Sequence, residues 1–294
     1  MNLMTYHFCL TTYKSPIHEI FKQGTVYALF ISKFSLVSLA YNNIDILYLE
    51  AADEIPASPS LQLRERTTEL CFNILHSYRQ VSGSFSKDLL LPERLKLLPL
   101  YILALSKSLG LQAFGWLDGK SYWRSRVSSI SVALAVPLVY PRMMAIHRLL
   151  SQEADGTPST PTIPLSTEFI TEDGIFLLEN GEDAVIYVGE KVDVCLFQQL
   201  FGMHFNDASN QFVLQQYENP SSRKFNDLIN GIRRLRCCYL CLHFYKKGDP
   251  SEVLFQSYMV EDKNAESLSY VEFLRHIGSK INSKLSKERR VLQI

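Results

Sequence analysis

Two cysteines, Cys238 and Cys241, form the one Cys-x-x-Cys motif in this sequence. Such a pair is redox-active when its first thiol lies at a helix N-terminus, where the dipole lowers the thiol pKa. A structural zinc site would need a second pair of ligands, and the sequence has no second motif of this kind. The motif lies in an apolar segment that is typical of a strand. It therefore predicts two thiols packed in a core, with a thiol oxidoreductase as the alternative.

The histidines show no metal-ligand spacing such as His-Glu-x-x-His. His147 and His204 are individually suited to act as bases, but neither has a nucleophile in a recognisable motif nearby. A glycine-rich phosphate loop, a nucleophile elbow and a dinucleotide fingerprint are all missing from the sequence. We therefore predict that the chain is not an enzyme and has no catalytic, cofactor-binding or metal-binding residues. The histidines are His7, His18, His76, His147, His204, His243 and His276.

Charged residues gather in three places. Arg233, Arg234 and Arg236 close a predicted helix, where cations face the negative end of the dipole. A contact with an acidic partner or with lipid headgroups is the alternative. The acidic residues at 168–173 and 179–183 do not follow the alternating oxygen-ligand pattern of a calcium loop.

The composition is that of an ordinary globular protein with room for two domains. The chain has 294 residues, of which 47% are hydrophobic, with 30 basic and 30 acidic residues. A net charge of zero argues against a nucleic-acid binder. The six cysteines, mostly single in apolar runs, and the lack of an Asn-x-Ser/Thr sequon fit a cytosolic protein.

One apolar stretch, residues 24–41, is long enough to raise the question of a membrane span. Lys33 lies at its centre, and the stretch falls short of the roughly 20 apolar residues that a span needs. A buried strand or helix, or a sequence that does not fold natively, is favoured over a span.

Helical periodicity dominates the next hundred residues. Apolar residues recur at three- and four-residue spacing from Leu63 to Tyr78, which predicts a helix. A second helix is expected at 89–108, where Pro99 should kink or split it. Shorter helices are expected at 116–126 and 141–150. These segments predict an all-α domain, followed by a Ser-, Thr- and Pro-rich linker.

The pattern then changes to mixed α and β. Asn180-Gly181 between two apolar runs predicts a hairpin, because both residues tolerate positive φ. Two helices should follow, at 194–203 and 219–236, and then two strands, at 238–245 and 252–260. A final helix carries apolar residues from Leu268 to Ile281. This order predicts a mixed sheet covered by helices.

Several strings of the sequence carry a family resemblance. LLLPERLKLLPLYILALSKS at 89–108 and LVYPRMMAIHRL at 138–149 resemble the helical domain of the COPII inner-coat cargo adaptors, the Sec twenty-four family. PLSTEFITEDGIFLLENGEDAVIYVG at 164–189 is similar to the entry into that family's gelsolin-like domain. Two further strings resemble the later parts of that domain and its closing helix: NPSSRKFNDLINGIRRLR at 219–236 and SYMVEDKNAESLSYVEFLRHI at 257–277. The resemblance runs in order from about residue 50 to residue 281.

The resemblance implies a multidomain fold, an all-α helical domain followed by a gelsolin-like mixed sheet covered by helices. The expected division is as follows. Residues 1–50 form a divergent segment that is a remnant of or replacement for the β-sandwich, 51–150 the helical domain and 151–163 the linker. Residues 164–285 form the gelsolin-like domain with its closing helix, and 286–294 a charged tail.

The resemblance also implies a function. Members of the family are non-catalytic subunits of the COPII coat, which carries protein from the endoplasmic reticulum to the Golgi. They pair with the Sec twenty-three subunit, are recruited by the small GTPase Sar one, and capture export signals on cargo and SNAREs. The implied location is the cytoplasm, peripheral on endoplasmic reticulum membranes and COPII vesicles.

The sequence departs from the family in what it lacks. It has no zinc finger with paired Cys-x-x-Cys motifs, so no zinc cofactor is expected, and it has no trunk domain and no complete β-sandwich. A truncated gene product is the expectation that follows. The alternatives are a protein-binding fragment without coat activity and an actin-binding module suggested by the gelsolin-like fold.

Overall fold

The computed structural model describes residues 60–82, 89, 91, 95–111, 117–129, 132–151, 162–204, 213–236 and 238–292. The expectations for residues 1–50, including the apolar stretch at 24–41, lie outside these residues, as does most of the linker. These residues form two compact units: the described residues up to Val132 and those of Tyr270–Leu292 make up the first, and those of Ala133–Ser269 make up the second.

The first unit is helical. Its described helices are α4 (Ser60–Ser82), α5 (Leu98–Lys107), the short 3-10 helix η2 (Leu109–Leu111), α6 (Leu117–Ser129) and α12 (Tyr270–Leu292). The α5 helix begins at Leu98, so that Pro99 lies in its first turn, where the missing N–H costs no hydrogen bond. The break expected at Pro99 is thus the start of a helix.

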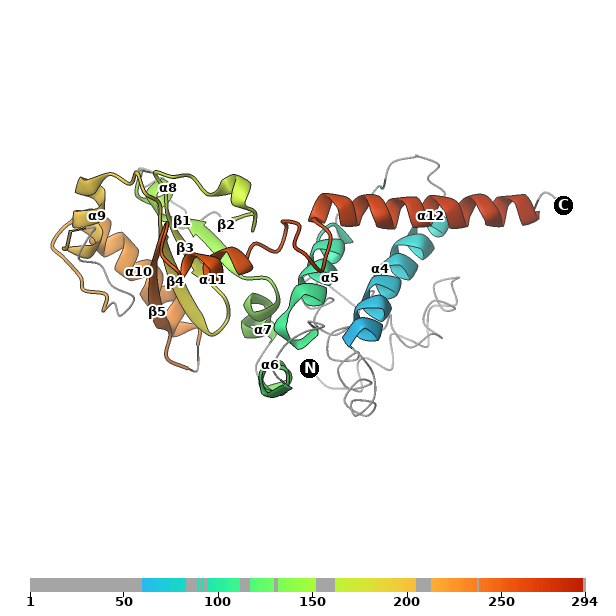
Figure 1. The fold of residues 1–294 in the computed structure, drawn as a ribbon, viewed down its shortest axis with the longest axis horizontal. Helices are drawn as coiled ribbons and strands as arrows, with labels where there is room; N and C mark the ends of the chain where they lie inside the picture. The colour runs from blue at the N-terminus through green and yellow to red at the C-terminus, as the bar shows by residue number, and fades with distance from the viewer. Residues whose placement is uncertain are drawn as a thin grey trace, which may run out of the picture. The chain divides into compact units, whose positions relative to one another are not determined.

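The core of the first unit is made by helices that are far apart in the sequence. The apolar stripe of α4 packs with residues of α5 and α12 in one buried cluster (Figure 1). Its members include Cys71, Phe72, Ile74, Leu75, Leu98, Ile102, Leu103, Phe273, Ile277 and Ile281. The closing helix, which we expected in the gelsolin-like domain, therefore belongs to the helical unit.

The charged tail expected at 286–294 is helical as far as Leu292. Glu288 accepts a hydrogen bond from Gln80 Nε2 at 2.9 Å and lies 3.3 Å from Nε2 of the buried His76. Burial lowers the pKa of His76, although Glu288 opposes this effect. The tail is thus an extension of α12 that is held against α4.

The second unit is built on a five-stranded sheet in the order β2-β1-β3-β4-β5. The strands are β1 (Arg142–Ala145), β2 (Thr162–Ile163), β3 (Ile175–Glu179), β4 (Asp183–Val188) and β5 (Cys241–Lys246). All neighbours are antiparallel except β4 and β5. The parallel pair is joined by a crossover through α9 (Val194–Phe201) and α10 (Pro220–Arg234), as parallel strands require.

Helices cover both faces of this sheet (Figure 1). On one face, α9 and α10 pack a group of aromatic rings against β5: Phe201 lies 5.9 Å from Phe225 and 5.6 Å from Phe244 between ring centroids. On the other face, α11 (Glu252–Ser257) stacks Phe255 on Tyr187 at 4.1 Å. The predicted mixed sheet covered by helices is confirmed.

Two predicted elements were wrong. Residues 142–145 form the strand β1, not the start of a helix, because they pair with β2 and β3 on both sides and this pairing overrides helix propensity. The helix α8 begins only at Ile146. Residues 252–257 form α11 instead of a strand, since a short apolar run does not distinguish the two by periodicity.

The domain boundary also differs from the expected one. Ala133–Leu150 was assigned to the helical domain, but it lies in the second unit and supplies both α7 (Val132–Val139) and β1 to it. Thr162–Ile163, expected in the linker, forms β2 at the edge of the sheet. The sheet needs these strands, because β3 is buried along its whole length.

The Asn180-Gly181 hairpin is confirmed. Gly181 has a φ of 92°, and a Cβ there would lie 2.7 Å from Leu138 Cγ. The side chain of Asn180 accepts hydrogen bonds from the amides of Glu182 and Asp183 at 2.9 and 2.8 Å. The turn is thus fixed by residue types that were readable from the sequence.

The stacked pair on the α11 face gives a test of this packing. Replacing Phe255 by Ala should lower the free energy of unfolding of the second unit by about 3–5 kcal/mol, because it removes a buried ring and leaves a cavity beneath α11. Urea denaturation followed by tyrosine fluorescence measures the change. The matched control is Val253→Ala in the same helix, which is 69% exposed and should shift stability by less than about 0.5 kcal/mol. Equal effects of the two substitutions would contradict the packing described.

Candidate functional site

The Cys-x-x-Cys residues are not core thiols, contrary to the prediction. Both Cys238 and Cys241 are exposed, whereas Cys71 is fully buried and its pKa is raised to about 12 by that burial. For Cys241 the prediction failed because β5 lies at the edge of the sheet and its alternate side chains point to the less covered face, whereas Cys238 precedes the strand. The motif begins in the connection before β5, not at a helix N-terminus, so no dipole activates either thiol.

Cys241 does lie near other potential ligands. The side chains of Asp183, Cys241 and His243 bring their ligand atoms within 4.8 Å of one another. Sequence reasoning missed this group because Asp183 is far from the motif along the chain, and only the pairing of β4 with β5 brings them together.

The arginine cluster separates into two roles. Arg233 and Arg234 lie in the last turn of α10, which confirms the predicted placement at a helix C-terminus. Arg236 lies beyond the helix, where its side chain is 4% exposed and forms an ion pair with the 1% exposed side chain of Glu179.

Glu179 is the centre of a buried polar network. Arg142 donates to its Oε2 from Nε at 2.8 Å and from Nη2 at 2.6 Å. Arg236 and the amide of Gly181 donate to its Oε1, and Arg236 also donates to the Glu182 carbonyl at 2.7 Å. The sequence placed Glu179 in an acidic turn and gave no sign of this role.

The other acidic group, at 168–173, also serves structure. Glu172 binds Lys191 and Lys247, and hydrogen bonds from these lysines lower its pKa to about 2. Thr167 donates to Asp262 from its backbone amide and from its hydroxyl. These pairs link residues 167–172 to later loops of the second unit.

The two histidines considered as bases serve other purposes. His147 Nδ1 lies 3.1 Å from the amide of Ile175, and its ring packs edge-on against Phe176. His204 is close to Gln198 on the surface.

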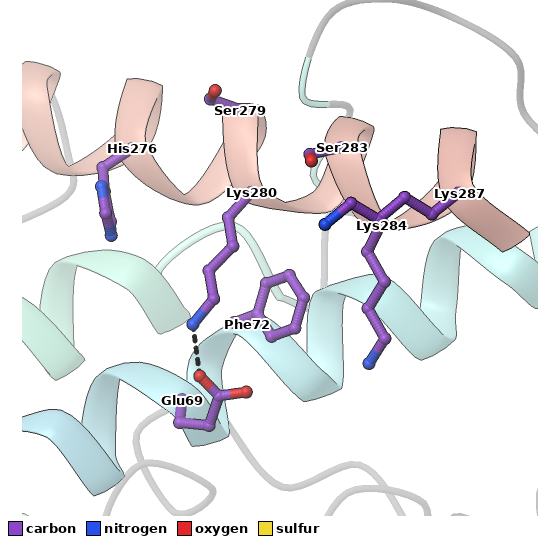
Figure 2. A pocket seen from close by; sticks show the side chains of 8 residues that line it. All are labelled: Glu69, Phe72, His276, Ser279, Lys280, Ser283, Lys284 and Lys287. Atoms are coloured by element: carbon purple, nitrogen blue, oxygen red, sulfur yellow. Dashed lines mark hydrogen bonds and ion pairs between the residues drawn. The ribbon is translucent and has the colours of Figure 1, made fainter.

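A basic groove lies between α4 and α12 in the first unit (Figure 2). It has a volume of about 570 Å³, and its lining residues are Glu69, Phe72, His276, Ser279, Lys280, Ser283, Lys284 and Lys287. Lys280 pairs with Glu69 and also lies over the Phe72 ring at 4.6 Å, with Lys284 at 5.1 Å. The groove can accept an anionic group, because three lysines face one acidic residue.

Comparison with known proteins identifies the family of the chain. Residues 44–137 match the family model of the Sec23/Sec24 helical domain. The chain is 48% identical over 240 residues to Protein transport protein SEC24 C of Arabidopsis thaliana, covering 81% of this chain and 22% of that protein. The chain belongs to the Sec24 family.

More distant members of the Sec24 family are also similar to this chain. The chain is 35% identical over 236 residues to human Protein transport protein Sec24C, covering 78% of this chain and 21% of that protein. The crystal structure of the human COPII-coat protein Sec24c superposes with a TM-score of 0.73 at 31% identity, covering 85% of this chain and 33% of that one. The chain thus spans about a fifth of the length of these curated relatives, and the resemblance read from the sequence is confirmed.

None of the helices among the described residues is long and apolar enough to cross a bilayer.

The Glu179 network yields a prediction. Glu179→Gln should lower the free energy of unfolding of the second unit by about 3–5 kcal/mol, because it leaves the buried Arg236 without its counter-charge. Chemical denaturation at neutral pH measures the loss. Glu168→Gln, an exposed carboxylate in the same unit, is the control and should change stability by no more than about 0.5 kcal/mol. If both variants behave alike, the ion pair does not hold the sheet together.

Proposed function

We propose that this chain is a scaffold part of a COPII cargo-adaptor subunit, acting in vesicle transport from the endoplasmic reticulum to the Golgi. The observation that carries the proposal is the 48% identity over 81% of the chain to a SEC24 protein. The agreement of the fold with human Sec24c supports it independently of the individual residues.

The proposed role is non-catalytic. Among the described residues that suggested chemistry, His147 is occupied in structural contacts, and Cys238 does not lie at a helix N-terminus. Catalysis by a thiol or a histidine needs a nucleophile and a base held within hydrogen-bond reach. The network around Glu179 and the stacked rings of the sheet favour a rigid scaffold.

The proposed partners are a Sec23-type coat subunit and the Sar one GTPase. Cargo and SNARE export signals are proposed as ligands of the whole adaptor. We place the protein in the cytoplasm, peripheral on endoplasmic reticulum membranes and COPII vesicles. The basic groove supports this location, since clustered lysines are attracted to anionic lipid headgroups.

Co-assembly tests the coat proposal directly. The purified chain is expected to bind the Sec23-type subunit in a pulldown that contains the GTP-loaded Sar one GTPase and acidic liposomes. Stoichiometric binding that withstands salt would support the scaffold role. A well-folded chain that fails to associate would instead be a protein-binding fragment without coat activity, and the proposal would be overturned.

The same liposomes test the groove by itself. Lys284→Ala combined with Lys287→Ala should weaken binding to acidic liposomes about 30-fold, since each lysine near an anionic surface contributes about 1 kcal/mol. The matched control is Arg223→Ala with Lys224→Ala, two exposed cations on α10 in the other unit. Sedimentation with liposomes measures both. Equal losses from the two pairs would show that no particular basic surface contacts lipid.

A further inference from the structure

Three side chains with different ligand atoms meet on one face of the sheet. The parallel register of β4 and β5 sets Asp183 beside Cys241 and Val185 beside His243. Side chains alternate along a strand, and Leu242 and Phe244 are buried against α9 and α10 at 7% and 1% exposure. Cys241 and His243 must therefore point to the opposite face, together with Asp183.

The separations suit a tetrahedral metal ion. Oδ2 of Asp183 lies 3.6 Å from Nε2 of His243. In a tetrahedral zinc site with bonds of about 2.0–2.3 Å, two ligand atoms lie about 3.3–3.8 Å apart. The carboxylate and the imidazole are thus already at the required spacing. The thiol of Cys241 lies within 4.8 Å of both and is exposed.

The surrounding backbone holds Asp183 in place. Asn180 Oδ1 accepts hydrogen bonds from the amides of Glu182 and Asp183, and Asn180 Nδ2 donates to the Tyr258 hydroxyl at 2.9 Å. Arg236 binds the carbonyl of Glu182 in the same turn at 2.7 Å. The carboxylate therefore projects from a fixed turn, which lowers the entropy lost when an ion is bound.

We infer that Asp183, Cys241 and His243 form a zinc-binding site with three protein ligands and one position open to water. A thiolate, an imidazole and a carboxylate are ligands that Zn²⁺ accepts together, whereas Ca²⁺ and Mg²⁺ prefer oxygen alone. The thiolate and the carboxylate balance the two charges of the ion. The site joins β4 to β5, so the bound ion clamps the edge strand of the sheet. The inference does not depend on coat assembly.

Metal titration of the full chain tests the site. The chelator-treated protein is titrated with Co²⁺, which reports thiolate ligation by a charge-transfer band, and Zn²⁺ affinity is then measured by competition with a chromophoric chelator. One ion per chain is expected, with a thiolate–cobalt band that Cys241→Ser abolishes. His243→Gln and Asp183→Asn should each weaken Zn²⁺ binding at least about tenfold, since even the loss of an outer-shell partner has an effect of that size.

Two variants distinguish this site from casual binding. Cys195→Ser and His204→Gln remove an exposed thiol and an exposed imidazole that lie outside the group, and both should retain the affinity and the band of the unmodified chain. Circular dichroism confirms that all variants are folded. A band that survives Cys241→Ser, or affinity that is indifferent to Asp183 and His243, would overturn the assignment.

Discussion

The second unit depends on the ion pairs that the buried carboxylate of Glu179 forms with two arginines. A charge with 1% exposure in a sheet must be paired, because its desolvation would otherwise cost more than the fold can supply. Arg142 from β1 and Arg236 from beyond α10 provide the pairing. One side chain thus joins a strand from before the linker, the hairpin and the segment that leads into β5. The position of β5, and with it the surroundings of Cys241 and His243, follows from where Arg236 is held.

The first unit depends on a different constraint: the C-terminal helix α12 must pack against α4 and α5 from the start of the unit. The apolar stripe of α4 is completed by Phe273, Ile277 and Ile281 of α12, about two hundred residues later. Hydrogen bonds also join the two helices. Arg79 of α4 donates to Asn282 of α12 at 2.8 Å, and Gln80 donates to Glu288. The helical unit is therefore completed by a segment that follows the sheet unit in the sequence.

The surfaces left by these two cores differ in chemistry. The α4–α12 pair presents lysines around the Phe72 ring, a basic groove suited to anionic groups (Figure 2). The edge of the sheet presents a thiol, an imidazole and a carboxylate in one place. Both surfaces are suited to bind ions or charged groups.

The sequence alone determined most of the long helices, the hairpin and the family. Periodicity located α4, α9, α10 and α12, and Asn180-Gly181 located the hairpin, because these features depend on neighbours within a turn or two. The tertiary structure decided what depends on distant partners. It turned 142–145 into a strand through pairing on both sides, gave α12 to the helical unit, and placed Arg236 against Glu179. It also exposed Cys241 at an edge beside Asp183 and His243. Local sequence records propensity, whereas burial, pairing and ligand geometry are set by residues that only the folded chain brings together.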